Sequence, residues 1–383
     1  MKRPRRGLLA AAAAAAAVLT LLGAALRSGA ARDDAGDADV EVGLLTRAMV
    51  SVAEALGARE PAYAIGCYAE TSAEPPADRE EEEPKRGSIF FLETSCRFRQ
   101  VETRARRSSR AGRLELGARQ ACAVESAARG NPGLQVYLLF ASPAARNWTA
   151  WSWAARELLA YPNVHIRHVN VERYLRGTPL EELYTSGALR RSYWPVSHAS
   201  DVLRFLTLWR YSGTYLDLDV VLTKPLDNMR NFAGAESPSN VAVGAINMAD
   251  DELGRRVANE CVHDIKESFR GDVWGHNGPG VMTRVLKRLC GVNKAVKMTP
   301  AKCGGFRVHP PSAFYPVSWS EWQLYFQEAG SDKTMARLRD SVAIHVWNKL
   351  SSKEGVRVGS RQPYGLIARR HCPRVYERSA PVF

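Results

Sequence analysis

The chain has 383 residues, 45% of them hydrophobic, which is enough to bury one large or two ordinary cores. Its formal net charge of +13 raises the question of nucleic-acid binding. The basic residues gather at the extreme N-terminus and between residues 97 and 119, with no interleaved aromatics and no nucleic-acid motif. We therefore expect no nucleic-acid partner and interpret the charge as solvated or anion-facing surface.

The N-terminal residues predict a membrane anchor. Residues 1–6 hold four basic side chains, and residues 7–26 form an uncharged run that ends at Arg27. Twenty helical residues rise about 30 Å, the thickness of a bilayer core, and the basic tail favours a cytosolic N-terminus. A cleaved signal peptide is the alternative, because small residues follow the run. Residues 27–86 are rich in Ala, Asp, Glu and Pro and predict a luminal stem.

The cysteines and one sequon fit a luminal chain. All seven cysteines follow the anchor, and disulfides persist in an oxidising lumen. The odd count leaves at least one unpaired, and Cys67 is the candidate. An Arg-rich segment between Cys96 and Cys122 is interpreted as an inserted loop closed by a disulfide between them, or as a surface that faces anionic membrane or nucleotide sugar. Asn147 is the candidate glycosylation site.

From residue 87 to residue 383, short apolar runs alternate with segments of helical periodicity. We expect strands at 88–94, 134–140 and 163–170, and helices at 120–129 and 151–161. This alternation predicts an α/β domain with a mostly parallel central sheet. Ligands of such sheets bind at the carboxyl ends of the strands.

Residues 196–213 predict a helix followed by a tight turn. Apolar side chains recur at helical spacing, Ser197 can cap the start, and Gly213 can end the helix. Asp201 and Arg204 lie three residues apart beside the apolar stripe, so they point to the same place. Taken alone, they would form an intrahelical ion pair.

The strand that follows ends in an Asp-x-Asp triplet, Asp217 and Asp219. A period of two places both aspartates and Tyr215 on one face. Two carboxylates at the end of a buried strand need a compensating cation, and Mn²⁺ or Mg²⁺ would accept them together with phosphate oxygens. Such an ion would neutralise a departing nucleoside diphosphate. The spacing alone is weak evidence, because Asp37 and Asp39 share it in a segment without a strand pattern.

A second chemistry fits the same triplet. In phosphatases of the haloacid-dehalogenase type, an apolar strand also leads into Asp-x-Asp, and the first Asp is a phosphorylated nucleophile. That motif should open its domain, whereas at least three expected strands precede it here. The order of elements therefore favours the metal site.

Seven segments between Ile89 and Pro373 resemble the α-1,4-glycosyltransferases. In chain order they are IFFLETS, CAVESAAR, SDVLRFLTLWRYSGTYLDLDVVLTKPL, VWGHNGPGVMTRV, AFYPVSWSEW, AIHVWNK and HCP. Seven ordered matches are far more specific than any single motif. The resemblance implies a single-pass type II Golgi membrane protein with a GT-A-type nucleotide-sugar-binding fold. It also implies a UDP-sugar donor, dependence on Mn²⁺ or Mg²⁺, and retention of anomeric configuration.

The same resemblance assigns roles to residues of this chain. Asp217, Asp219 and His345 match the metal site, although His345 read alone would be a core histidine. Asn277, in the loop from His276 to Gly280 that resembles an acceptor-side wall, joins the two aspartates as a catalytic residue. The implied donor-binding residues are Phe91, Leu92, Glu93, Asp201, Arg204, Tyr215, His276, Gly278, Trp347 and Lys349.

Two details stand beside these assignments. Ser212-Gly213 replaces the Gly-Gly that relatives commonly carry, and a positive φ at Ser212 would cost on the order of 1 kcal/mol. Tyr315, Trp319 and Trp322 are interpreted as core, with a sugar-stacking platform as the alternative.

The expected activity is transfer of galactose, or of an N-acetylhexosamine, to a terminal sugar of a glycolipid or glycoprotein. The retaining step would be front-side, with the leaving diphosphate helping to deprotonate the acceptor, since no protein nucleophile is evident. The alternative is a catalytically silent, membrane-anchored glycan-binding protein on the same fold. Besides the acceptor and the Golgi membrane, a homodimer is compatible with the sequence.

Overall fold

The computed structural model describes residue 65 and residues 83–95, 114–142 and 152–383. The predicted tail, the anchor, nearly all of the stem, the Arg-rich segment and Asn147 lie outside these residues. Within the described residues, no helix is long and apolar enough to cross a membrane.

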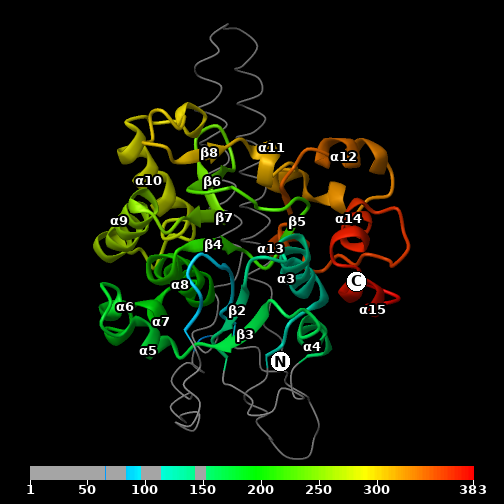
Figure 1. Ribbon diagram of the computed structural model, residues 1–383, viewed down its shortest axis with the longest axis horizontal. Coiled ribbons are helices and arrows are strands. Elements are labelled where there is room, and N and C mark those ends of the chain that lie inside the picture. Colours follow the sequence, from blue (N-terminus) through cyan, green and yellow to red (C-terminus); the bar gives the residue numbers. More distant parts are fainter. Residues whose placement is uncertain (1–64, 66–82, 96–113, 143–151) are drawn as a thin grey trace, which may run out of the picture. The chain divides into compact units, whose positions relative to one another are not determined.

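The described part is an α/β structure around a seven-stranded sheet (Figure 1). The strand order is β3-β2-β1-β4-β7-β6-β8, and four of the six neighbouring pairs are parallel. The remaining strands, β5 and β9, form a separate antiparallel pair. The strands are β1 (Ile89–Glu93), β2 (Val136–Phe140), β3 (Val164–His168), β4 (Gly213–Leu216), β5 (Val220–Leu222), β6 (Phe232–Ala235), β7 (Val241–Met248), β8 (Arg307–His309) and β9 (Ala343–His345). The prediction of an α/β fold with a mostly parallel sheet is confirmed.

The helices follow the strands in the predicted alternation. The α-helices are α3 (Ala118–Gly130), α4 (Trp153–Leu158), α5 (Val171–Leu175), α6 (Glu181–Thr185), α7 (Ala188–Arg191), α8 (Pro195–Tyr211), α9 (Glu252–Ser268), α10 (Pro279–Cys290), α11 (Pro311–Phe314), α12 (Ser331–Leu338), α13 (Asn348–Ser351), α14 (Pro363–His371) and α15 (Pro373–Arg378). Two 3₁₀-helices are η3 (Ala295–Lys297) and η4 (Trp319–Tyr325). All five elements expected between residues 88 and 170 are present, with bounds that differ by a few residues.

Both faces of the central sheet are covered. Along β1, Ile89 and Phe91 join one buried apolar cluster, to which α3 contributes, and Phe90 and Leu92 join another, to which α8 contributes. Successive strand side chains point to opposite faces, so a continuous apolar run such as IFFL needs packing partners on both sides. This is the physical reason that helices flank the sheet.

Two disulfides tie distant parts of the chain together. Cys122 of α3 is bonded to Cys372, which follows α14, so the predicted bridge from Cys96 to Cys122 is wrong. Cys290 is bonded to Cys303. Among the described cysteines the free one is Cys261, which is buried in α9. Cys67 and Cys96 lie outside the described residues.

The helix-turn-strand segment forms as predicted, with one shift. Helix α8 begins at Pro195, two residues before the expected cap Ser197, because proline suits the first helical position. The helix ends at a left-handed turn, with φ of 51° at Ser212 and 105° at Gly213. A Cβ on Gly213 would lie 2.2 Å from the carbonyl oxygen of Ser88, so only glycine fits there. The expected positive φ at Ser212 is present.

Candidate active site

The two aspartates lie where the chain passes from one sheet to the other. Strand β4 ends at Leu216 and β5 begins at Val220, so they do not share one continuous strand as expected. The backbone N–H of Asp217 donates to Gly244 of β7 at 2.8 Å, and the N–H of Val220 donates back to Asp217 at 2.9 Å. The second bond closes a turn. The strand is interrupted at the residues that sequence reasoning selected.

A histidine from the far end of the chain completes the group. His345 ends β9, and the antiparallel pairing of β5 with β9 sets it opposite Val220. Its Nε2 lies 3.2 Å from Oδ1 of Asp219 and 3.9 Å from Oδ2 of Asp217. One ligand atom from each of the three residues lies within 4.8 Å of the others. The structure thus brings together the three residues predicted to hold a metal.

Each carboxylate has one oxygen engaged by the protein. Oδ1 of Asp217 accepts from the hydroxyl of Tyr215 at 2.7 Å and from the guanidinium of Arg204 at 2.9 Å. Oδ2 of Asp219 accepts from the backbone N–H of Asn348 at 2.8 Å. These bonds fix the rotamers and leave the other oxygen of each carboxylate facing His345.

The charges in this group are strongly coupled. Burial alone would raise the pKa of Asp217, but Arg204 and His345 outweigh burial and hold the pKa at about 2. Burial alone would lower the pKa of His345, but Asp219 and Asp217 outweigh it and raise the pKa. Asp217 therefore stays ionised, and the neighbouring carboxylates favour positive charge on the His345 ring.

The three candidate ligand side chains fit a divalent cation. Two carboxylate oxygens and an imidazole suit Mn²⁺, and ligand atoms at right angles around such an ion lie about 3 Å apart, close to the 3.2 Å between His345 and Asp219. The buried hydroxyl of Tyr315 and Oδ1 of Asn348 have no hydrogen-bond partner among the described residues. Tyr315 lies beside the site, because its hydroxyl and Oδ2 of Asp217 would both crowd a Cβ on Gly244. Unpaired polar atoms beside an acidic group are what a bound ion and its oxygen ligands would satisfy.

Asp201 and Arg204 form an intrahelical ion pair, and Arg204 also reaches Asp217 at the end of β4. The guanidinium of Arg204 is buried, stacks on the ring of Tyr215, and bonds both Asp201 at 3.1 Å and Asp217 at 2.9 Å. It has no open face for a donor sugar. Its role in this structure is to hold the carboxylate of Asp217. The carboxylate of Asp201 lies against the backbone of Gly278, where an added Cβ would lie 2.3 Å from Oδ1.

The segment after His345 is strained and carries two predicted donor-binding residues. Trp347 has φ of 54° and ψ of 52°, a left-handed conformation that is unusual for a bulky residue and typical of functional sites. Its indole Nε1 donates to the carbonyl of Val317 at 2.9 Å, and its ring lies 4.2 Å from that of His345. Lys349 is exposed, with Nζ 4.1 Å above the ring of Trp274.

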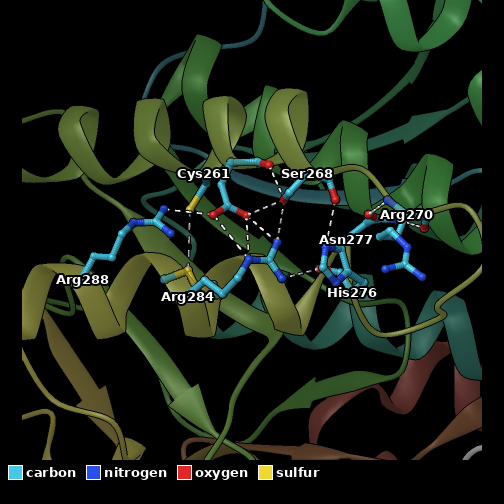
Figure 2. Close-up of polar contacts among 9 residues, drawn as sticks. Cys261, Ser268, Arg270, His276, Asn277, Arg284 and Arg288 are labelled. Atoms are coloured by element: carbon cyan, nitrogen blue, oxygen red, sulfur yellow. Dashed lines mark hydrogen bonds and ion pairs between the residues drawn. The ribbon is translucent and has the colours of Figure 1, made fainter.

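The loop between α9 and α10 is braced by its own polar side chains, which Figure 2 shows. The amide of Asn277 accepts from the N–H of Arg270 at 2.9 Å and donates to its carbonyl at 2.7 Å, so both polar atoms are used by the backbone. His276 bonds the carbonyl of Ser268 through Nε2, and burial lowers its pKa. The guanidinium of Arg284 reaches the carbonyl of His276 at 3.3 Å and also pairs with buried Asp264. In this structure Asn277 therefore positions the loop, and its predicted catalytic role stays a prediction.

The first strand offers less than predicted to a donor. Phe91 has no exposed surface and Leu92 is buried in the core. The carboxylate of Glu93 is also buried and accepts from Ser95 and from Gln120. The side chains of these residues support the end of β1, so a donor would meet this region through the backbone or through neighbouring groups.

Sequence reasoning missed Glu236 and His198, and it left Tyr315 between a core role and a sugar-stacking role. Tyr315, expected in the core, is 3% exposed, but its hydroxyl reaches the acidic group. Glu236 follows β6 close enough to His345 to feel its charge, and burial raises the pKa of this carboxyl. His198 of α8 is fully buried and bonds the carbonyl of Trp274 at 3.1 Å. Glu236 and His198 belong to none of the seven motifs, so only the fold reveals them. Tyr315 lies in AFYPVSWSEW, but that motif does not place its hydroxyl at the acidic group.

An Asp-x-Asp pair between two sheets, with a histidine opposite, is a site for a cation that binds phosphate oxygens. The class that this site suggests is borne out by comparison: residues 117–235 match the glycosyltransferase sugar-binding region containing the DXD motif. The chain is a glycosyltransferase.

The particular family follows from the rest of the chain. Residues 250–379 match the α-1,4-glycosyltransferase conserved region. Lactosylceramide 4-α-galactosyltransferase of Rattus norvegicus is 33% identical over 76% of this chain and 75% of its own length. Human α-1,4-N-acetylglucosaminyltransferase is 28% identical over 76% of this chain and 80% of its own length. The chain belongs to the α-1,4-glycosyltransferase family.

Among solved structures, the galactosyltransferase LgtC in complex with donor and acceptor sugar analogs is 13% identical to this chain. The match covers 76% of this chain and 95% of LgtC, with a TM-score of 0.36. A score this low carries no argument about function. Membership of the family rests on the sequence relatives.

Proposed function

We propose that this chain transfers galactose from a UDP-sugar, with retention of configuration, to a terminal sugar of a glycosphingolipid such as lactosylceramide. The observation that carries the proposal is the convergence of Asp217, Asp219 and His345 in a member of the α-1,4-glycosyltransferase family. Relatives named for lactosylceramide support the acceptor class. Localisation in the Golgi membrane, with the catalytic domain in the lumen, belongs to the same proposal.

The acidic and the basic side chains of the site have different roles. Asp217 and Asp219 would hold Mn²⁺ or Mg²⁺ through the oxygens that face His345. When bound, the ion supplies electrostatic stabilisation of the leaving diphosphate. Arg204 keeps Asp217 ionised and in place, and Tyr315 offers an unpaired hydroxyl beside the site. The exposed amine of Lys349, held over Trp274, offers a second cation to phosphate oxygens.

A second donor class is supported by the N-acetylglucosaminyltransferase among the relatives. Pocket shape decides whether an acetamido group fits, and no single motif reports that shape. The two candidates share the metal site and the retaining step. They differ in the sugar that is transferred from UDP to the acceptor.

The test is a donor panel with the full-length chain. UDP-Gal, UDP-GalNAc, UDP-GlcNAc and UDP-Glc are offered with Mn²⁺ and a set of glycolipid acceptors, and transfer is measured by product mass. We expect UDP-Gal with lactosylceramide to be the preferred pair. Preference for UDP-GlcNAc would select the second candidate.

Two controls test the metal assignment. EDTA should abolish transfer, and added Mn²⁺ should restore it. Asp219→Asn, a near-isosteric change, should lower transfer at least about a hundredfold, because one charge of the cation site is lost. Normal turnover by Asp219→Asn, or transfer unaffected by EDTA, would rule out this role. A glycan-binding protein without activity would bind acceptor but turn over no donor.

A further inference from the structure

A cleft of about 200 Å³ opens at the opposite end of β5 from the metal site. Its basic lining consists of Arg129, Lys224, Arg370 and His371, and none of its lining residues is acidic. Asp219 comes directly before β5 and Thr223 directly after it. At about 3.3 Å per strand residue, these two positions lie about 13 Å apart. The cleft is therefore separate from the candidate active site.

Three elements bring these side chains together. Arg129 lies in the last turn of α3, Arg370 and His371 end α14, and Lys224 follows β5. The disulfide from Cys122 in α3 to Cys372 after α14 helps to hold the two helices in place. Figure 1 shows α3, β5 and α14 next to one another. The cleft is thus built on regular elements rather than on a loose loop.

The three permanent cations have no carboxylate partners. Nη1 of Arg129 donates to the carbonyl of Arg370 at 3.1 Å, and Nζ of Lys224 donates to the carbonyl of Asp340 at 2.7 Å. Neither residue, nor Arg370, forms an ion pair with any described residue. Among the described residues, most exposed arginines with a bonded head group are paired with acids, as Arg357 is with Glu328. In this cluster three cations without an acidic partner line one cleft.

Helix ends account for part of this charge. Basic residues in the last turn interact favourably with the carbonyls there, and each helix C-terminus is equivalent to roughly half a negative charge. The ends of α3 and α14 together therefore offset about one positive charge. Three permanent cations converge on the cleft, so an excess of about two remains.

We propose that this cleft binds a phosphate or sulfate group of an anionic ligand. Two guanidinium groups and an ammonium group around one opening match the several acceptor oxygens of such a group. The excess of about two charges fits a dianion. The shared chemistry could come from a free oxyanion or from the headgroup of an anionic lipid.

The lowered pKa of His371 is consistent with an electropositive cleft. Burial lowers its pKa, and Arg370 and Arg129 lower it further, to about 4. A bound oxyanion would oppose the two arginines. The pKa of this ring should therefore rise when the cleft is filled, which gives a readout local to the cleft.

The first experiment measures binding of inorganic phosphate to the full-length chain in neutral detergent. Calorimetry gives the affinity, and NMR of the His371 ring reports occupancy, with chloride at matched ionic strength as the reference. We expect phosphate to bind and to raise the pKa of His371. The double variant Arg129→Gln/Arg370→Gln should bind phosphate at least tenfold more weakly, and Lys224→Gln alone severalfold more weakly.

The matched control is Arg190→Gln/Lys302→Gln, which removes two exposed cations elsewhere on the chain. Its phosphate affinity should equal that of the unchanged protein. All changed residues are exposed, so circular dichroism should report native folding for every variant. Equal losses in the cleft and control variants, or no response beyond that to chloride, would overturn the proposal.

The second experiment separates the two sources of the anion. Unchanged and double-variant protein are added to preformed phosphatidylcholine vesicles, with or without phosphatidic acid, and attachment is measured by flotation. Both proteins share the same N-terminus, so the difference between them is the readout. Weaker attachment of the double variant to the acidic vesicles assigns a lipid headgroup. Equal attachment together with weaker phosphate binding assigns a free anion.

Discussion

The side chains at the two ends of β5 carry opposite charge, and the two sets of charges differ in how far the protein pairs them. Before the strand, Asp217 and Asp219 are largely enclosed, and each carboxylate has one oxygen fixed by hydrogen bonds. After the strand, Lys224 joins two arginines that are exposed and have no acidic partner among the described residues. The acidic end is preorganised by the fold, because buried charges must be paired. At the basic end, the placement of the helices brings cations together without acidic partners. Exposed charges tolerate this arrangement.

The largest expected effect comes from removing a cation at the acidic end. Arg204→Met should lower the free energy of unfolding by about 3 to 5 kcal/mol, because it leaves Asp201 and Asp217 without their buried partner. Denaturant unfolding in neutral detergent measures this. At the basic end, Arg370→Met should change stability by less than about 0.5 kcal/mol. Similar losses at both ends would contradict the comparison.

The next effect concerns the ion that the acidic end is built to hold. His345→Ala removes the imidazole that lies 3.2 Å from Asp219 and should weaken Mn²⁺ binding at least about tenfold. Calorimetric titration of the full-length chain with Mn²⁺ measures the change without any need for turnover. His263→Ala, at a partly exposed histidine that bonds its own helix, is the matched control. If both variants bound Mn²⁺ equally well, His345 would not be a ligand.

A smaller effect is expected at the turn that leads into β4. Ser212 has φ of 51° and ψ of −176°, a conformation that glycine adopts freely and other residues adopt at a cost. Ser212→Gly should therefore raise the free energy of unfolding by about 1 kcal/mol. Ser239→Gly, at an exposed serine whose φ is not positive, should not raise the free energy of unfolding. A loss at Ser212 would mean that its bond to Arg86 outweighs the strain.

The smallest effect is a pH dependence at the basic end. The pKa of His371 is about 4 when folded, lowered by burial, Arg370 and Arg129, against about 6.5 in an unfolded chain. Between these values the unfolded chain binds a proton that the folded chain does not, so stability falls as the pH drops from about 6.5 to 4. His371→Gln should remove part of that fall. Because the ring is partly open to solvent, we expect about 1 kcal/mol or less.

Unfolding in phosphate-free buffer at several pH values checks this last prediction. His263→Gln is the control, since that residue lies in α9, away from the cleft. The slope of stability with pH should become shallower only in the His371 variant. An unchanged slope would mean that His371 is already protonated in the folded chain.

Sequence reasoning predicted local structure well where one feature decides it. The apolar run of β1, flanked by turn residues, could only be a buried strand, and the periodicity of α8 was sufficient to locate that helix. The N-cap of α8 was expected at Ser197 but is Trp194, three residues earlier, because Pro195 outweighed the serine cap. The wrong disulfide had a different cause. Proximity in sequence suggested Cys96 for Cys122, but the fold brings Cys372 there, 250 residues away.

The candidate site was predictable in composition but not in geometry. The two aspartates and the late histidine were identified from ordered motifs, and they do converge. The contact of Arg204 with Asp217 joins a helix to the residues after β4, and the contact of Asn277 with the backbone of Arg270 closes a loop. Such contacts leave no periodic signal in the sequence. The same holds for Glu236, which lies in no motif, and for the position of the Tyr315 hydroxyl beside the acidic group.

The sequence by itself determined the α/β alternation, the family and the identity of the acidic pair, because these depend on local periodicity and on the order of motifs. Only the tertiary structure decided that the strand breaks at Asp217, that His345 of β9 faces the break, and that four basic groups gather beyond β5. The physical reason is that charge acts through space. Its strength depends on burial and on neighbours that the chain brings together only when it folds.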